Sequence, residues 1–353
     1  MWEKKKLGDV INLQRGYDLT HAQRTTGEFP VVSSSGITDY HSEFKEQGPG
    51  VITGRYGTLG EVYYVQGNYW PHNTTLFVEN FKGSHPRFIY YLLQILGLDN
   101  NNDAGAVPGV NRQSLHAIQV SVPPLPLQRQ IAGVLGRYDA LLENYQGQVA
   151  ALEGMAQELY REWFVRGRCP GAEAGSEGEL PAGWVVERLG DVIELKYGKA
   201  LVAENRMLGE VPVVGSSGIV DFHDEALVDR PGIVVGRKGN VGSVFWLDKP
   251  FYPIDTVFYV KSDLSPYYLF YNLQEQSFIS GDAAVPGLNR EQALGNKIVV
   301  PDANSLAEFD QIVKSVFNKI SNLNNQASLL RATRDALLPR LLSGHLLPSA
   351  LTG

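Results

Sequence analysis

The pentapeptide Leu7-Gly8-Asp9-Val10-Ile11 recurs unchanged 182 residues later as Leu189-Gly190-Asp191-Val192-Ile193. Four further stretches also match, with substitutions. They are residues 30–37 with 212–219, 54–60 with 236–242, 70–74 with 252–256, and 106–112 with 284–290. The last pair is offset by 178 residues, so the second copy has lost about four residues. Because this period is far longer than a solenoid repeat, the chain is a tandem duplication of two whole domains.

The composition is that of an ordinary globular protein. The 353 residues are 43% hydrophobic and 20% charged, which suits about two domains. The longest apolar stretch, Phe88–Leu98, is broken by Gln94 and is too short to span a membrane. The N-terminus lacks the apolar core of a signal peptide, so we expect a cytoplasmic protein without membrane contact. The single cysteine, Cys169, excludes internal disulfides and multi-cysteine zinc sites.

The net charge of −7 argues against a self-sufficient nucleic-acid binder, which is usually strongly basic. If the chain binds DNA, it uses local basic clusters or the help of a partner.

Each copy has two parts of different texture. Residues 1–124 and 181–302 are rich in glycine, valine and aromatic residues, with short apolar runs bounded by turn residues, which predicts strand-rich α+β domains. Helical spacing predicts one helix near residues 86–97 and another near 266–277. Each part ends in proline, and a long helical pattern follows it.

The long helical patterns carry apolar residues at alternating spacings of four and three. In copy two these are Phe309, Val313, Val316, Ile320, Leu323, Ala327, Leu330, Leu337 and Leu341, with Arg334 as the polar break. In copy one they are Leu127, Ile131, Val134, Tyr138, Leu141, Tyr145, Leu152, Met155 and Leu159, with Gln148 as the break. Such a stripe is typical of a coiled-coil seam. Two helices of this kind most simply pair with each other, and antiparallel pairing would hold the domains at opposite ends of a rod. Ordinary amphipathic core helices are the alternative.

Most catalytic signatures are absent. No Gly-x-x-x-x-Gly-Lys-Ser/Thr loop occurs, and the only Pro-Pro pair, Pro123-Pro124, lacks the Asn/Asp-Pro-Pro-aromatic form that amino-methyltransferases need. The seven histidines show no metal-ligand spacing, and we interpret the matching pair His41 and His223 as structural. We therefore expect no catalytic residue, no metal and no cofactor.

The segment Gly-Arg-x-Gly-x-x-Gly, at residues 54–60 and 236–242, is the most specific local pattern. Its glycines let the backbone approach a ligand, and Arg55 and Arg237 offer a planar fork for phosphate or for guanine O6 and N7. A glycine hairpin with a solvated arginine is the alternative interpretation.

Two other repeated segments suit nucleic-acid contacts. The pairs Asn111-Arg112 and Asn289-Arg290 are residue types that read adenine and guanine edges, although each Asn is equally suited to cap a helix. Serines at residues 33–35 and 216–217 suit phosphates and are equally ordinary in a turn. In residues 70–74 and 252–256, Pro and Thr persist while the tips change from His-Asn to Ile-Asp. A constant framework with varied tips is how two modules would read different sequences.

Together these motifs resemble the specificity subunit of type I restriction-modification systems. Further points of resemblance are the lead into the first long helix (Pro123-Pro124-Leu125, Gln128 and Ile131), the helix end at residues 158–164 and the terminus at residues 337–344. One departure is that the lead into the second helix, residues 300–306, lacks the second proline and blurs the Gln-x-x-Ile spacing.

The resemblance implies an α+β fold in which two duplicated α/β target recognition domains are joined by two long helices forming an antiparallel coiled coil with pseudo-two-fold symmetry. It implies a non-catalytic subunit whose recognition domains each read one half of a bipartite site in double-stranded DNA. It further implies two methyltransferase subunits as partners and, in the full complex, restriction subunits that translocate DNA. A nuclease or methyltransferase would need motifs that are missing, and a duplicated scaffold or carbohydrate-binding protein would not explain the repeated Gly-Arg and Asn-Arg segments.

We expect six segments: recognition domain 1 (1–124), a central long helix (125–168), a linker (169–180), recognition domain 2 (181–302), a C-terminal long helix (303–345) and a tail (346–353). The expected DNA-binding residues are Ser34, Arg55, Tyr56, Asn73, Thr74, Asn111, Arg112, Ser216, Arg237, Lys238, Asn240, Asp255, Thr256, Asn289 and Arg290.

Overall fold

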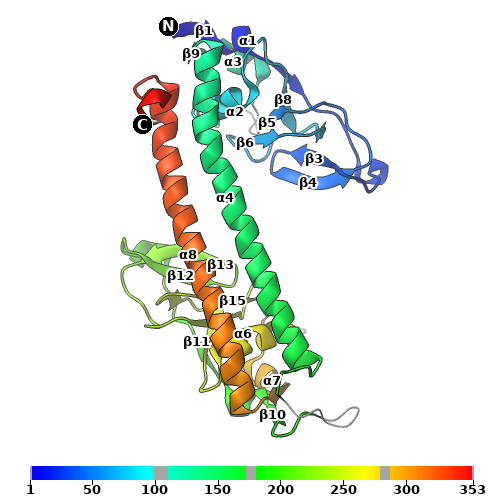
Figure 1. Cartoon of the computed structure of the whole chain (residues 1–353), viewed down its shortest axis with the longest axis vertical. Coiled ribbons are helices and arrows are strands. Elements are labelled where there is room, and N and C mark those ends of the chain that lie inside the picture. Colours follow the sequence, from blue (N-terminus) through cyan, green and yellow to red (C-terminus); the bar gives the residue numbers. More distant parts are fainter. Residues whose placement is uncertain (1, 99–109, 172–179, 279–286, 352–353) are drawn as a thin grey trace. The chain divides into compact units, whose positions relative to one another are not determined.

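A computed structural model describes residues 2–98, 110–171, 180–278 and 287–351 (Figure 1). The contacts divide the chain into unit 1, which comprises residues 1–145 and 326–353, and unit 2, which comprises residues 146–325. The linker predicted at 169–180 lies mostly outside the described residues, as do the Val-Pro-Gly residues before Asn111 and the Val-Pro residues before Gly287.

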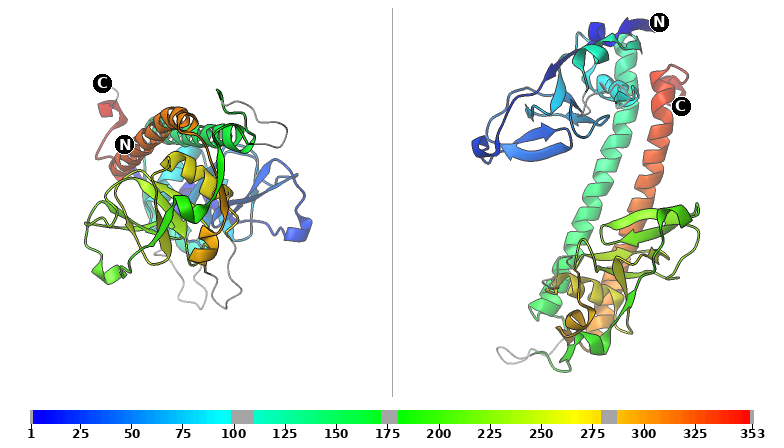
Figure 2. Two further views of the ribbon diagram at one scale, coloured as in Figure 1. Left: turned by 90° about the horizontal axis from the view of Figure 1, so that it is seen from below. Right: turned by 180° about the vertical axis from the view of Figure 1, so that it is seen from behind.

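Unit 1 begins with a strand-rich domain. Its elements are β1 (Glu3–Lys6), α1 (Leu7–Val10), β2 (Asn12–Arg15), η1 (His21–Gln23), β3 (Phe29–Ser33), β4 (Gly36–His41), β5 (Gly50–Gly54), β6 (Val62–Val65), β7 (Trp70–Pro71), β8 (Thr75–Asn80), α2 (Pro86–Gln94), α3 (Arg112–Ala117) and β9 (Gln119–Val122). An antiparallel sheet has the order β2-β8-β5-β6, a second sheet has the order β4-β3-β7, and β1 pairs with β9. The β3–β4 hairpin extends away from the long helix α4 of its unit (Figure 2, right).

Unit 2 repeats this order element by element. It contains β10 (Val185–Arg188), α5 (Leu189–Val192), β11 (Glu194–Tyr197), η4 (Ala203–Asn205), β12 (Val211–Gly215), β13 (Gly218–His223), β14 (Gly232–Gly236), β15 (Val244–Leu247), β16 (Tyr252–Pro253), β17 (Val257–Lys261), α6 (Pro266–Glu275), α7 (Arg290–Leu294) and β18 (Lys297–Val300). Its sheets have the orders β11-β17-β14-β15, β13-β12-β16 and β10-β18. The duplication seen in the sequence is therefore a duplication of the fold, and the helices expected near 86–97 and 266–277 are α2 and α6.

Two long helices follow the two domains. Helix α4 (Leu125–Tyr160) ends in a π-helical turn at Arg161–Val165, and α8 (Ala303–Leu342) is followed by a short 3-10 turn, η5 (Pro348–Leu351). The two starts differ where the sequence departs from the family pattern. Before α8, the Asp302 carboxylate accepts hydrogen bonds from the backbone N–H groups of Asn304 and Ser305, as a helix cap does. At the start of α4 the buried Gln128 side chain instead donates to the Pro123 carbonyl.

In each unit, the start of one long helix packs against the end of the other, so the pairing is antiparallel. In unit 1, Ile131 and Leu135 of α4 share a core with Leu338 and Leu342 of α8. Unit 2 has the reciprocal arrangement, in which residues near the end of α4 share a core with residues near the start of α8: Ala156, Tyr160, Phe309 and Val313. Each core also contains α2 or α6, which ties the domain to the helices.

The seam predicted for α4 is confirmed at Ile131, which is fully buried, and is wrong at Leu141 and Met155. Leu142 and Ala156 are 5% and 1% exposed, whereas Leu141 and Met155, which the prediction placed in the seam, are 39% and 52% exposed. The reason is that α4 packs on α2 and α6 as well as on α8, as when Tyr160 stacks on Tyr271. The buried face is therefore set by several neighbours and not by a two-helix seam alone.

Candidate nucleic-acid interface

In unit 1, hydrogen bonds bring four distant segments together after strand β5. The N–H groups of Arg55 and Tyr56 donate to the Thr74 carbonyl at 2.8 and 3.2 Å, and the Val110 N–H donates to the Arg55 carbonyl at 3.0 Å. The Ser34 N–H donates to the Thr74 hydroxyl at 3.3 Å. The Gly-Arg loop, the loop at residues 70–74, the serine turn and the segment before Asn111 therefore form one surface.

Unit 2 builds the same surface from different side chains. The N–H groups of Arg237 and Lys238 donate to the Thr256 carbonyl at 2.9 and 3.1 Å, and the Leu288 N–H donates to the Arg237 carbonyl at 2.8 Å. The Ser216 carbonyl accepts a hydrogen bond from the Ser243 hydroxyl at 2.9 Å. Since main-chain groups make the bonds that join the Gly-Arg loops to Thr74, Val110, Thr256 and Leu288, that part of the framework does not depend on the side chains at the tips.

The glycines of the Gly-Arg loops have a structural reason. A Cβ atom at Gly54 would lie 1.9 Å from the Thr58 carbonyl oxygen, and one at Gly236 would lie 2.1 Å from the Asn240 carbonyl oxygen. Each loop connects two antiparallel strands, β5 to β6 and β14 to β15. The loop is therefore a hairpin connection, as the alternative interpretation held, but its arginines are not freely solvated.

The two arginines are held in different ways. The Arg55 guanidinium lies 4.4 Å from the ring centre of its neighbour Tyr56 and donates to the Tyr56 hydroxyl at 3.1 Å. The Arg237 guanidinium lies 5.0 Å from the ring centre of Tyr197 and donates to the Asp255 carbonyl at 3.0 Å. Both arginines are half-buried.

Asn111 and Asn289 are helix caps. Their side-chain oxygens accept hydrogen bonds from the backbone N–H groups of Gln113 and Gln292, at 2.8 and 3.1 Å. The neighbouring arginines differ: Arg112 is exposed, whereas the Arg290 side chain donates to the Leu195 carbonyl at 2.8 Å and is partly committed to the framework.

The tip of the variable loop carries a hydrogen-bond donor, Asn73, in unit 1 and a carboxylate, Asp255, in unit 2. In unit 1, Asn73 donates to the Asp18 carboxylate, which also lies 3.5 Å from Arg15. In unit 2, the Asp255 carboxylate lies 3.8 Å from the Lys238 ammonium group. The Asn240 side chain is exposed on the Gly-Arg loop.

The predicted site does not include the side chains at the ends of β2 and β11, although these side chains contribute to the two surfaces. Asp18 and Tyr197 contact the predicted site residues Asn73 and Arg237, and Arg15 contacts Asp18. Arg15 and Tyr197 occupy matching positions 182 residues apart. The available signal was that this position changes from Arg to Tyr directly before a glycine that both copies keep, Gly16 and Gly198.

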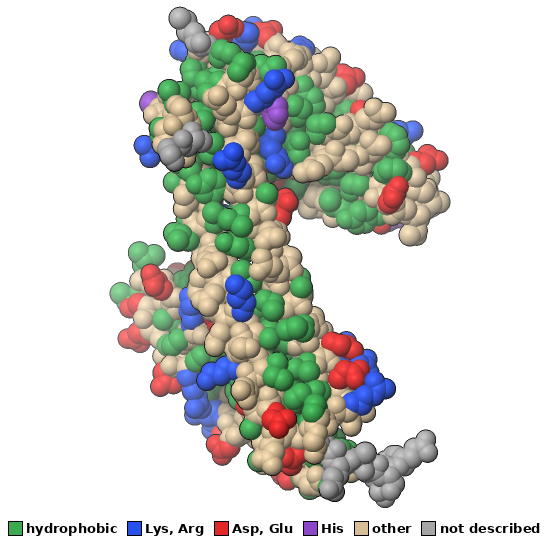
Figure 3. Space-filling model, in the orientation of Figure 1, with side chains coloured by type: hydrophobic (Ala, Val, Ile, Leu, Met, Phe, Trp, Pro, Cys, Tyr) green, Lys and Arg blue, Asp and Glu red, His purple; other side chains and the backbone are tan. Residues whose placement is uncertain are grey.

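Basic and acidic side chains are interspersed on the face of the chain drawn in Figure 3. The face in Figure 3 shows Lys and Arg in small groups among Asp and Glu, without a continuous basic area. Across the described ranges, no group of His, Cys, Asp and Glu side chains suits a metal ion, and no helix is long and apolar enough to cross a membrane. His41 and His223 are structural, because their Nδ1 atoms accept hydrogen bonds from the backbone N–H groups of Thr25 and Met207.

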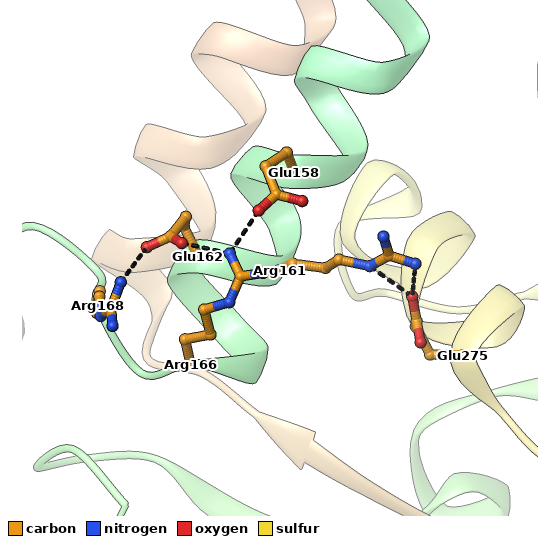
Figure 4. A network of polar contacts seen from close by, with 6 residues as sticks. All are labelled: Glu158, Arg161, Glu162, Arg166, Arg168 and Glu275. Carbon is orange, nitrogen blue, oxygen red and sulfur yellow. Dashed lines mark hydrogen bonds and ion pairs between the residues drawn. The ribbon is translucent and has the colours of Figure 1, made fainter.

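The motif at residues 158–164 closes the core of unit 2. Tyr160, Trp163 and Phe164 are buried, and the Phe164 ring lies 5.0 Å from that of Phe309. On the outside, Arg161 reaches across to α6 and pairs with Glu275 at 2.8 Å (Figure 4). This motif therefore anchors the end of α4 to the second domain.

A duplicated fold whose matching loops present arginine, asparagine and hydroxyl groups on a constant framework defines a class of paired recognition modules. The family model "Type I restriction modification DNA specificity domain" matches residues 1–153 and 181–329. The chain belongs to this family.

Individual proteins of the family are similar to this chain over most of its length. The type I restriction enzyme MjaIX specificity subunit of Methanocaldococcus jannaschii is 25% identical over 73% of this chain and 68% of its own length. A putative type I specificity subunit of Mycoplasma pneumoniae, S.MpnORF507P, is 21% identical over 90% of both chains. The crystal structure of a type I restriction-modification S subunit from M. genitalium has the same fold, with a TM-score of 0.63, 17% identity, and coverage of 97% of this chain and 96% of that chain.

Proposed function

We propose that the chain is the non-catalytic specificity subunit of a type I restriction-modification complex and that each recognition domain reads one half of a bipartite site in double-stranded DNA. The observation that carries the proposal is the pair of matching loop surfaces. Their backbone framework is the same in both units, while the side chains change from Tyr56 and Asn73 to Lys238 and Asp255. Different base sequences call for different side chains on one scaffold.

The DNA-contacting set of the proposal is the predicted one, with separate roles for its members. Arg55 and Arg237 read base edges, while the serine and threonine hydroxyls and Arg112 contact phosphates. Asn111 and Asn289 act through their caps, because their side-chain oxygens are already used.

The partners of the proposal are two methyltransferase subunits, joined in the full complex by restriction subunits. A net charge of −7 repels DNA, so the methyltransferase subunits would supply phosphate contacts that this surface lacks. The long helices would dock these subunits and set the spacer between the half-sites. This arrangement uses the domain division 1–124, 125–168, 169–180, 181–302, 303–345 and 346–353. We also propose a cytoplasmic location, because the single cysteine suits a reducing compartment.

The test uses the chain assembled with its methyltransferase subunits. Sequencing of methylated sites in cells gives both half-sites and the spacer. Arg55→Ala should relax one half-site and Arg237→Ala the other, each by about 1–3 kcal/mol of base discrimination. Arg230→Ala is the matched control, since Arg230 is exposed just before β14 whereas Arg237 follows its last residue. If neither Arg55→Ala nor Arg237→Ala alters the methylated sequence, the loops do not read DNA.

A further inference from the structure

Arg237 lies over a pair of aromatic rings that the sheet places side by side. Tyr197 of β11 and Phe258 of β17 are cross-strand partners, and their ring centres are 4.9 Å apart. The Arg237 guanidinium lies 5.0 Å from the Tyr197 ring centre and 5.9 Å from that of Phe258. Phe258 is fully buried, whereas Tyr197 is 53% exposed, so the pair forms a platform at the surface of the domain.

A second contact fixes the rotation of the guanidinium on this platform. Its Nη1 donates to the Asp255 carbonyl at 3.0 Å, and that carbonyl belongs to the variable loop. Within the described part of the chain, Nε and Nη2 have no hydrogen-bond partner. Ring contacts hold the face of this guanidinium, and one hydrogen bond holds its edge. Its other N–H donors therefore remain available in one fixed orientation.

We propose that Tyr197 is a positioning residue that orients Arg237 to donate two hydrogen bonds to O6 and N7 of a guanine in the half-site read by unit 2. This inference rests on the proposed function and adds to it a ligand group and a second residue. Preorganisation is the physical reason: an arginine already held in its reading orientation loses less side-chain entropy on binding and discriminates more sharply.

Unit 1 lacks this platform. The matching cross-strand pair there is Arg15 and Leu76, which offers no aromatic face. The ring over which Arg55 lies belongs to Tyr56 of its own loop, and the described residues offer Arg55 no other ring. The inference is therefore specific to unit 2, and unit 1 provides an internal control within the same molecule.

The experiment measures DNA binding by the complex of the chain with its methyltransferase subunits. The duplexes carry the methylated site, with each guanine of the unit 2 half-site replaced in turn by 7-deazaguanine, which lacks the N7 acceptor. At one position the wild-type complex should lose about tenfold in affinity, and Arg237→Ala should abolish that sensitivity. Tyr197→Leu should remove most of the sensitivity, and Tyr197→Phe, which keeps the ring, should retain it.

The outcomes separate the two levels of the argument. If Arg237→Ala removes the 7-deazaguanine sensitivity and Tyr197→Leu leaves it intact, Arg237 orients itself and the inference is wrong. If Tyr197→Leu weakens recognition of both half-sites equally, its effect is on folding, and the inference is again wrong. If Arg237→Ala leaves the recognition of every base in both half-sites unchanged, the proposed DNA-reading role of the loop itself fails.

Discussion

The two units fill the same position of the fold with opposite chemistry. Asp139 of α4 and Phe317 of α8 occupy the same place, counted from the first residue of each helix. Asp139 contacts α2 in unit 1, and Phe317 contacts α6 in unit 2. Asp139 accepts a hydrogen bond from Tyr91 and pairs with Arg334 at 2.8 Å, and these two charged side chains are only 13% and 22% exposed.

In unit 2 the corresponding cluster is aromatic. The Phe317 ring lies 5.1 Å from Trp246 and 5.8 Å from Phe270, and Ala156, counted in the same way, holds the place in α4 that Arg334 has in α8. This helix junction therefore accepts either a polar or an aromatic cluster. An aromatic cluster gains free energy from burial, whereas a polar network mainly restricts which partners fit, because desolvation offsets most of its Coulomb energy.

The largest expected effect is on the aromatic side of this comparison. Phe317→Ala should lower the free energy of unfolding of unit 2 by about 3 kcal/mol, the low end for a buried aromatic residue. The low end applies because Phe317 lines an open groove with a volume of about 1020 Å³, into which neighbours and water can move. Hydrogen exchange of α6 measures the loss, with α2 as the internal control. Faster exchange confined to α2 would contradict the assignment.

Asp139→Ala should cost unit 1 about 2 kcal/mol, because it removes the charged partner of both Arg334 and Tyr91. The double variant Asp139→Phe with Arg334→Ala gives unit 1 the residues of unit 2 at these two places and should recover most of the loss. Urea unfolding followed by exchange of α2 measures both variants. A double variant less stable than Asp139→Ala would show that the polar network is required for the packing of unit 1.

The smallest effect is a difference in acid sensitivity. Burial lowers the pKa of His72, His85 and His116 in unit 1 from the usual 6.5, whereas the matching residues of unit 2 are Ile254, Ser265 and Leu294. Because the unfolded chain then binds protons more readily than the folded one, unit 1 should lose stability as the pH falls below about 6.5. Exchange rates of α2 and α6 on either side of that pH test this, and equal responses would refute it.

A matched variant locates part of the acid sensitivity. His85 stands at the N-cap of α2 without a side-chain cap, and its buried Nδ1 lacks a partner among the described residues. In unit 2 the Ser265 hydroxyl accepts a hydrogen bond from the Tyr268 N–H at 3.0 Å. His85→Ser should therefore stabilise unit 1 by about 1 kcal/mol and reduce its pH dependence.

The sequence predicts the elements that occur in both copies, but not the side-chain contacts that differ between the two units. The duplication, the strand-rich domains and the paired long helices are visible because the same pattern appears twice over whole elements. At Leu141 the predicted seam of α4 is wrong by one residue, because Leu141 and Leu142 are both apolar and only the packing of the neighbouring helices decides which is buried. Neither the ring beneath Arg237 nor the Asp139–Arg334 pair could be predicted, because each joins segments that only the fold brings together.

The two units are built from different parts of the chain, and this affects when each can fold during synthesis on the ribosome. Unit 2 is one continuous stretch of chain, whereas the core of unit 1 needs Leu338, Leu341 and Leu342, near the end of the chain. At translation rates of about 5–20 residues per second, the apolar face around Ile131 and Leu135 waits on the order of 10–40 s for its partner. The half of the protein made first is therefore completed last. During that interval its exposed surface is open to capture by chaperones or by the same segment of another nascent chain.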